Sequence, residues 1–188
     1  DIGSETVALF LQRGASVFGT ALSEAGIARL IARTGPHERL ATGCADVSRE
    51  ADVKAMVAAA QARFGRIDIL FNNAGIEGGP TSAWKLSNEM SQADFDLVFA
   101  VNVSGVFLCM KHVIPLMAKQ GSGSIVNMSS VAGIRPAAGQ IAYAASKAAV
   151  IGMTRTAALE WGEAGVRVNC VNPGPIEGRM MEAIASGI

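Results

Sequence analysis

The chain has 188 residues, half of them hydrophobic, and its 16 basic residues balance its 16 acidic ones. This length suits one domain with a single core. A net charge of zero gives none of the overall basic character with which proteins bind nucleic-acid backbones or anionic membranes. We therefore expect a protein that acts on small molecules and binds neither nucleic acid nor membrane.

Short apolar segments rich in β-branched residues alternate along the chain with segments of helical periodicity. The predicted strands are residues 15–20, 41–47, 67–75, 124–130 and 166–174, and the predicted helices are residues 4–14, 23–35, 48–65, 90–121 and 143–165. Strands that are apolar on both faces and alternate with helices indicate a parallel sheet with helices on both faces. The predicted fold class is therefore α/β, doubly wound.

The most apolar long stretch, residues 95–114, is interrupted by polar residues such as Asn102 and Lys111, so we expect a buried helix and no membrane span. The three cysteines, Cys44, Cys109 and Cys170, lie far apart and form no CxxC pair. This pattern predicts buried thiols in a reducing cytoplasm and no metal site.

Polar or glycine-rich clusters follow four of the five predicted strands, at "GTALS" (19–23), "NNAG" (72–75), "NMSS" (127–130) and "NPG" (172–174). Because the carboxyl ends of parallel strands meet at one edge of the sheet, ligands bind there. We expect the functional site at that edge.

The only tyrosine, Tyr143, stands four residues before Lys147, so both lie on one face of a predicted helix. A nearby ammonium favours the phenolate and lowers the tyrosine pKa from about 10. By spacing alone the pair is either an incidental surface pair or an acid–base couple.

With "NNAG", "NMSS", "YAASK" (143–147) and "NPGPI" (172–176) in this order, the chain resembles the short-chain dehydrogenase/reductases. The resemblance implies a Rossmann-like fold in which residues 1–188 form a single dinucleotide-binding and catalytic domain. Residues 14–26 look like the 3-oxoacyl-(acyl carrier protein) reductases of that family. Family members begin with a further strand and a TGxxxGxG turn and continue beyond "NPG", so we expect both ends of this sequence to be truncated.

The resemblance assigns a reacting site to four residues. Tyr143 is the acid that protonates a carbonyl oxygen, or the base in alcohol oxidation, and Lys147 lowers its pKa and holds the nicotinamide ribose. Ser130 orients the substrate oxygen, and Asn102 bends its helix and holds a water connected to Lys147. From the residues alone, Ser130 is a turn serine and Asn102 a buried structural amide.

The resemblance also implies a binding surface for a nicotinamide cofactor. Gly3 matches the last glycine of the pyrophosphate turn, and Asp46 with Val47 matches the pair that holds adenine. By itself, Asp46 is more simply a turn residue. The predicted cofactor-binding residues are Ile2, Gly3, Thr20, Ser23, Asp46, Val47, Asn73, Ala74, Gly75, Tyr143, Lys147, Pro173, Gly174 and Ile176.

The end of the second family strand predicts the type of cofactor. Ala21 stands where a carboxylate would accept the adenine-ribose hydroxyl of NAD. Thr20 and Ser23 leave this position neutral, with hydroxyls that can donate to a phosphate. We therefore favour NADP(H), with NAD(H) possible; Arg29 or Arg33 would supply a cation, or both are ordinary solvated arginines.

The predicted function is hydride transfer between NADP(H) and a ketone or secondary alcohol through Ser130, Tyr143 and Lys147. The alternatives are an NAD-dependent alcohol dehydrogenase and a non-catalytic dinucleotide-binding regulator. Residues 95–119 and 143–163 carry surplus apolar side chains, which predict a homo-oligomer, either a dimer or a tetramer. Residues 76–88 and 131–140 are mostly small and apolar and predict a hydrophobic, non-ionic substrate.

Overall fold

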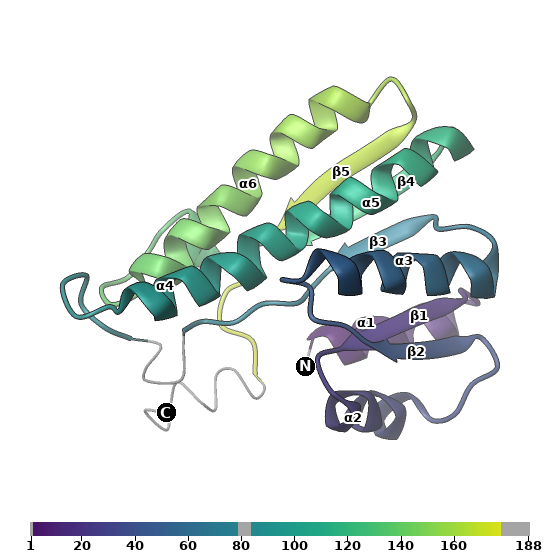
Figure 1. The fold of residues 1–188 in the computed structure, drawn as a ribbon, viewed down its shortest axis with the longest axis horizontal. Helices are drawn as coiled ribbons and strands as arrows, with labels where there is room; N and C mark the ends of the chain where they lie inside the picture. Colours follow the sequence, from purple (N-terminus) through teal and green to yellow (C-terminus); the bar gives the residue numbers. More distant parts are fainter. Residues whose placement is uncertain (1, 79–83, 178–188) are drawn as a thin grey trace.

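The structure, a computed structural model, describes residues 2–78 and 84–177, in which five strands alternate with helices (Figure 1). Every predicted strand and helix is present, with its ends shifted by a few residues, and the α/β fold class is confirmed. The elements are α1 (Ile2–Gln12), β1 (Val17–Ala21), α2 (Glu24–Thr34), β2 (Leu40–Cys44), α3 (Glu50–Phe64), β3 (Ile69–Asn72), α4 (Gln92–Phe99), α5 (Gly105–Gln120), β4 (Gly123–Met128), α6 (Ile141–Trp161) and β5 (Val166–Val171).

The strands are all parallel, as predicted, but within the described residues they form two sheets rather than one. β1 pairs with β2, and β4 lies between β3 and β5 in a three-stranded sheet. β1 and β3 do not hydrogen-bond to each other, and each is paired on one side only within the described residues. The register aligns Asn72 with Asn127 and Asn127 with Cys170, so β3, β4 and β5 end at the same edge.

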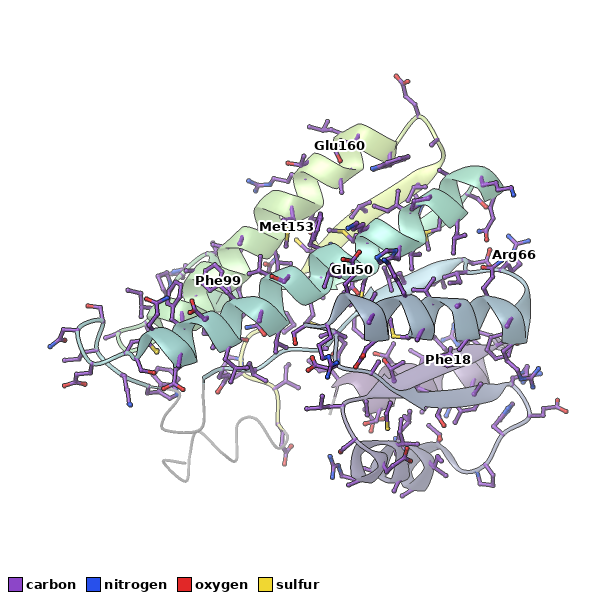
Figure 2. All side chains as sticks on the ribbon, in the orientation of Figure 1. Phe18, Glu50, Arg66, Phe99, Met153 and Glu160 are labelled. Atoms are coloured by element: carbon purple, nitrogen blue, oxygen red, sulfur yellow. The ribbon has the colours of Figure 1, made fainter. Side chains whose placement is uncertain are left out.

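The main core lies around the three-stranded sheet. Its buried residues come from α3, α5, β4, α6 and β5, and Ile125, Val150 and Val166 are fully buried. On the outer side of this layer, Glu50 lies between α3 and α5 (Figure 2). Its carboxylate accepts a hydrogen bond from Lys111 Nζ at 2.9 Å and lies 2.9 Å from His112 Nε2, so α3 and α5 are tied together at the surface as well.

α4 and α5 form one continuous helix, joined by a π-helical turn at Ala100–Ser104. By length and composition, Gln92–Gln120 is apolar enough to cross a membrane, since an 18-residue window in it has a mean hydropathy of 1.8. One face of it packs in the protein, because Val106, Val113 and Met117 belong to the main core, while Leu97 and Phe107 are exposed. The prediction of a buried helix therefore holds for the face that packs on the core.

Candidate active site

The polar clusters that follow β3, β4 and β5 meet at the carboxyl edge of the three-stranded sheet. Ser129 and Ser130 follow β4 directly, and the backbone N–H of Val131 donates to the carbonyl of Pro173, 2.9 Å away, in the loop after β5. The amide of Asn72 donates to Asn127 Oδ1 at 2.8 Å and joins the ends of β3 and β4. The edge expected to hold the site is therefore assembled from three strands.

α6 brings Tyr143 and Lys147 to this edge on one helical face. The Lys147 ammonium lies 5.5 Å from the centre of the Tyr143 ring, and Ser130 is near enough to Tyr143 to lower the pKa of its phenol. Ser130 Oγ also accepts from the backbone N–H of Ala132 at 3.1 Å, which fixes its side chain at the start of the turn. The three residues predicted to act on a substrate are therefore neighbours.

Lys147 is held in place by hydrogen bonds at its ammonium and at its backbone carbonyl. Its side chain is only 3% exposed, and its ammonium donates to the carbonyl of Met128 at 3.0 Å. Ser129 Oγ donates to the backbone carbonyl of Lys147 at 2.8 Å, a structural role that locks this turn of α6 against the end of β4. Gly133 allows the close approach, because a β-carbon there would lie 2.8 Å from the Lys147 backbone.

Asn102 is fully buried in the π-helical turn, a local form that often marks functional sites. Its amide accepts from the backbone N–H of Ile76 at 2.9 Å and donates to the carbonyl of Ile76 at 2.8 Å. It also donates to Ser146 Oγ at 3.0 Å, and Ser146 in turn donates to the carbonyl of Tyr143 at 2.7 Å. Asn102 thus connects the turn after β3 to the helix that carries Tyr143 and Lys147.

The ionisation of the site follows mainly from burial. Burial lowers the pKa of Lys147 to about 8, and the nearby Glu77 carboxylate opposes that shift. Burial raises the pKa of Tyr143, the nearby Ser130 side chain lowers it, and the charge of Glu77 raises it, so that the net shift is upward. This direction is opposite to the lowering expected from Lys147, because desolvation of the phenolate is the largest cause of the shift.

Gly75, in the "NNAG" turn, lies next to both Lys147 and Asn102. A β-carbon at Gly75 would lie 3.1 Å from the Lys147 ammonium and 3.3 Å from Asn102 Oδ1, so the glycine leaves open space beside the lysine. Lys147 has three N–H donors, of which Met128 takes one. A partly exposed turn beside a lysine whose ammonium has one hydrogen-bond acceptor among the described residues fits a ribose with two hydroxyls, as a nicotinamide cofactor would present.

The other predicted cofactor-binding residues lie on α1, at the end of β1, at the start of α2 and in the loops after β3 and β5. Ile2 and Gly3 begin α1, Thr20 is exposed on β1, and Ser23 caps α2 by accepting from the backbone N–H of Gly26. Asn73 and Ala74 lie in the turn after β3, and the exposed Gly174 and Ile176 follow Pro173 in the loop after β5.

Asp46 is engaged within its own turn. Its carboxylate accepts from the backbone N–H of Ser48 at 2.9 Å and from Ser48 Oγ at 2.6 Å, as in the simpler interpretation of this residue. Val47 packs against Gly105, where a β-carbon would lie 2.8 Å away. The pair connects the start of α3 with the start of α5.

Two residues of the site were missed by the sequence analysis. Ser146 stands inside the "YAASK" motif, and its small side chain gave no sign of its bond to Asn102. Glu77 lies in a segment taken as small and apolar, yet its carboxylate interacts electrostatically with both Lys147 and Tyr143.

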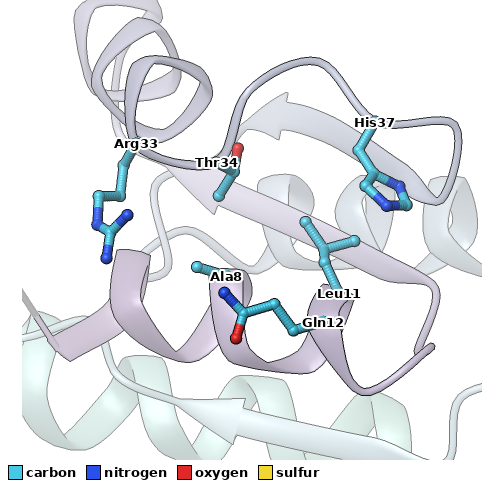
Figure 3. A pocket seen from close by; sticks show the side chains of 6 residues that line it. All are labelled: Ala8, Leu11, Gln12, Arg33, Thr34 and His37. Atoms are coloured by element: carbon cyan, nitrogen blue, oxygen red, sulfur yellow. The ribbon is translucent and has the colours of Figure 1, made fainter.

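A hollow of about 300 Å³ lies between α1 and α2, lined by residues that include Leu11, Arg33 and His37 (Figure 3). Arg33 is paired with Glu5 through two side-chain hydrogen bonds, which leaves it a poor candidate for a phosphate cation. The hollow belongs to the two-stranded sheet and not to the Tyr143 site.

The fold and the site define a class: an α/β protein of Rossmann-like topology with a serine, a tyrosine and a lysine gathered at the carboxyl ends of its strands. A family model described as short chain dehydrogenase matches residues 1–188. The chain therefore belongs to the short-chain dehydrogenase family.

Similar sequences are named reductases and dehydrogenases. The chain is 46% identical to levodione reductase from Leifsonia aquatica over 154 residues, which cover 81% of this chain and 55% of that protein. It is 41% identical to a 3-oxoacyl-(acyl-carrier-protein) reductase of Thermotoga maritima over 184 residues, covering 97% of this chain and 73% of that protein. The chain thus spans just over half the length of the first of these relatives.

Solved structures agree with the fold. A crystal structure of levodione reductase matches with a TM-score of 0.93 and 40% identity, covering 98% of this chain and 71% of that one. ElxO with NADP bound matches with a TM-score of 0.89 and 32% identity, covering 99% and 74%. An NAD⁺-bound xylitol dehydrogenase matches with a TM-score of 0.90 and 30% identity, covering 98% and 70%, so structures with either nicotinamide cofactor are similar to this chain.

Proposed function

We propose that the protein transfers a hydride between NADP(H) and a ketone or secondary alcohol, with Ser130, Tyr143 and Lys147 at the reacting carbon. The observation that carries the proposal is the grouping of these three side chains at one sheet edge, braced by Asn102. A protein that only binds a dinucleotide has no need of a serine and a tyrosine gathered beside a buried lysine.

In this proposal Tyr143 donates the proton to the carbonyl oxygen during reduction. The upward shift of its pKa keeps the phenol protonated at neutral pH, which suits an acid. Ser130 donates to the same oxygen and orients it, while Lys147 holds the ribose and returns a proton to the phenolate. The cofactor, when bound, supplies the hydride.

A direct assay tests the proposal. The purified protein is mixed with a panel of ketones and either NADPH or NADH, and oxidation of the nicotinamide is followed by absorbance. Turnover of at least one ketone is expected, and cofactor binding without turnover of any ketone or alcohol would favour the dinucleotide-binding regulator.

The preference for NADP(H) is supported by the end of β1. Ala21 supplies no carboxylate, and Thr20 and Ser23 are exposed hydroxyls. The guanidinium of Arg29 lies 3.8 Å from the position of a β-carbon on Gly26, as does Ser23 Oγ, so both reach the start of α2, where a phosphate is favoured. Arg29→Ala should weaken NADPH more than NADH, and Arg13→Ala, an exposed arginine after α1, is the control.

One observation supports the NAD alternative. Glu24, in the first turn of α2, accepts a hydrogen bond from Cys44 Sγ at the end of β2, at 3.2 Å. A carboxylate at these strand ends would repel a ribose phosphate. If NADH is the better cofactor, Glu24→Gln should shift the preference toward NADPH.

We also propose a homo-oligomer in the cytoplasm. Phe107 on α5 is 50% exposed and Leu159 on α6 is 85% exposed, which supports contact through these helices. The cysteines of the chain are free, in keeping with a reducing compartment. Sedimentation of Leu159→Asp should show a smaller species than wild type, with Leu22→Asp, 73% exposed and on the two-stranded region, as the control.

A further inference from the structure

Three buried polar side chains form a chain of hydrogen bonds from β3 to α6. Asn72 on β3 donates to Asn127 Oδ1 on β4 at 2.8 Å, and Asn127 donates to Thr154 Oγ1 on α6 at 3.0 Å. Thr154 in turn donates to the carbonyl of Val150 at 2.7 Å. Asn127 is fully buried, and Asn72 and Thr154 are buried as well. The proposed mechanism gives these three side chains no role.

Asn127 stands at the centre of this chain, and both ends of its amide have partners. Its oxygen accepts from Asn72, and its nitrogen donates to Thr154 and, at 3.4 Å, to Met110 Sδ. A buried amide is unfavourable unless its hydrogen bonds are made. Hydrogen bonds depend on distance and direction, whereas apolar packing is non-directional. The bond to Thr154 therefore fixes the position of α6 along β4 more sharply than the surrounding apolar contacts do.

α6 is attached to the same strand at a second point, where Ser129 Oγ donates to the backbone carbonyl of Lys147 at 2.8 Å. Ser129 extends the pairing of β4 with β5, because its N–H donates to the carbonyl of Val171 at 2.9 Å. Asn127 and Ser129 are two residues apart, which places their side chains on one face of the strand. Lys147 and Thr154 are seven residues apart, about two helical turns, on one face of α6. The two attachments thus lie in line along both elements.

The elements joined in this way carry the residues of the reacting site. Ser130 directly follows Ser129, and Tyr143 and Lys147 lie in the first two turns of α6. If α6 slid along β4 or turned on it, the distance between Ser130 and Tyr143 would change. A displacement of about 1 Å can slow catalysis by about a hundredfold. One attachment still allows the helix to turn about that point, whereas two attachments prevent both sliding and turning.

We propose that Asn127 and Thr154 are positioning residues: together with Ser129 they hold α6 on β4, so that the helix keeps Tyr143 and Lys147 aligned with Ser130. This inference rests on the proposed function, because it concerns the same site. Asn127 and Thr154 are buried and act through the helix, not by contact with a substrate. Their loss should therefore lower kcat and leave KM little changed.

Removal of one attachment or of both tests the proposal. Thr154→Val removes the hydroxyl with little change of shape, and Ser129→Ala removes the other attachment. Each single variant should lower kcat for ketone reduction about threefold, and the double variant about a hundredfold, well beyond the roughly tenfold product of two independent effects. KM for the ketone and the binding of NADPH should stay close to wild type. Thr154→Ser should restore kcat, and Thr156→Val, an exposed threonine on the same helix, is the control.

The single variants decide the matter if circular dichroism shows that the double variant does not fold. A kcat of Thr154→Val equal to that of Thr154→Ser would then overturn the inference. With a folded double variant, losses of kcat that simply multiply would overturn it, as would a rise in KM in place of a fall in kcat.

A second readout does not depend on turnover, because Tyr143 is the only tyrosine of the chain and ultraviolet titration follows its phenol alone. Burial raises the pKa of Tyr143. In the double variant the helix is free to move, so this pKa should fall toward its ordinary value of about 10. An unchanged pKa of Tyr143 in a folded double variant would overturn the inference while leaving the proposed function intact. Absence of turnover with every ketone, in wild type, would instead overturn the proposed function, and the titration would still test the attachment.

Discussion

The two sheets of this protein differ in how firmly their residues are held. The three-stranded sheet packs on α3, α5 and α6 through a continuous core, and side chains such as Ile125 and Val150 are fully buried. In the two-stranded sheet only Gly19 is buried among the strand residues, and α1 and α2 contribute a small set of buried side chains. None of the core cluster comes from β1, β2, α1 or α2.

This difference in side-chain burial matches the function proposed for each region. Ser130, Tyr143 and Lys147 must keep a fixed geometry, and they lie at the carboxyl edge of the well-packed three-stranded sheet. Thr20 and Ser23, proposed to discriminate between cofactors, are exposed at the end of β1 and the start of α2. Such surface positions can change without disturbing the core, so cofactor preference is free to vary while the reacting site is constrained.

The largest expected effect is on stability in the three-stranded region. Ile125→Ala leaves a cavity in β4 and should lower the free energy of unfolding by about 2–5 kcal/mol. Ile31→Ala, on α2, removes a side chain that is already 39% exposed and should cost much less. Urea unfolding of both variants measures the difference, and equal losses would contradict the comparison.

Asn102→Ala should cost about 2–3 kcal/mol, because it leaves the partly buried N–H and carbonyl of Ile76 without their partner. It should also lower kcat, since the turn before Glu77 and the helix carrying Tyr143 lose their connection. Gln12→Ala, an exposed amide on α1, is the matched control for the two-stranded region. Normal stability together with normal kcat in Asn102→Ala would argue against a bracing role.

Raising the pH should increase the free energy of unfolding, because the buried ammonium of Lys147, in the three-stranded region, is unfavourable in the folded chain. Burial lowers the pKa of Lys147 from 10.5 to about 8. Below about pH 8 the lysine is protonated in both the folded and the unfolded chain, and the full cost of its burial is present. Between about pH 8 and pH 10 the unfolded chain binds the proton more tightly, so the free energy of unfolding rises with pH.

Comparison with Lys147→Met isolates this effect from other titrations. The free energy of unfolding of wild type relative to that variant should rise from neutral pH toward about pH 10, with Glu77 and Tyr143 the ionisable groups acting nearby. Above that range the raised pKa of Tyr143 introduces a second change. A difference that is constant with pH would show that Lys147 is not shifted.

The smallest effect is expected at the surface of the two-stranded region. Arg33 and Glu5 join α1 to α2 across a pair that is more than half exposed on both sides. Solvent and salt screen such a pair, so Glu5→Gln should change the midpoint of urea unfolding little and less at high salt. A loss as large as that of Ile125→Ala would reverse the proposed ranking of the two regions.

The sequence predicted the elements well because each carries its own signal. Apolar β-branched runs became strands, and Gly35, Gly65 and Gly121, with positive φ, end helices where glycine was expected. The pairing of strands was predicted less well. β1 and β3 do not pair with each other. Which strands lie side by side cannot be read from the periodicity along one strand.

In the site, too, the features that follow from local motifs were predicted, and those that depend on partners distant in sequence were not. The positions of Ser130, Tyr143 and Lys147 follow from an ordered set of motifs, but the direction of the Tyr143 pKa shift depends on burial, which no motif encodes. Ser146 and Glu77 were missed because their importance comes from partners distant in sequence, Asn102 for one and Lys147 for the other. The roles of the cofactor-binding residues stay predictions.

The central claim is that Tyr143 is the acid of a carbonyl reduction, and Tyr143→Phe tests it most directly. The variant keeps the ring beside Lys147 and loses only the hydroxyl. Its kcat for ketone reduction should fall by at least about a hundredfold, while NADPH binding, measured by fluorescence, stays close to wild type. A Tyr143→Phe protein that reduces ketones as fast as wild type would contradict the account.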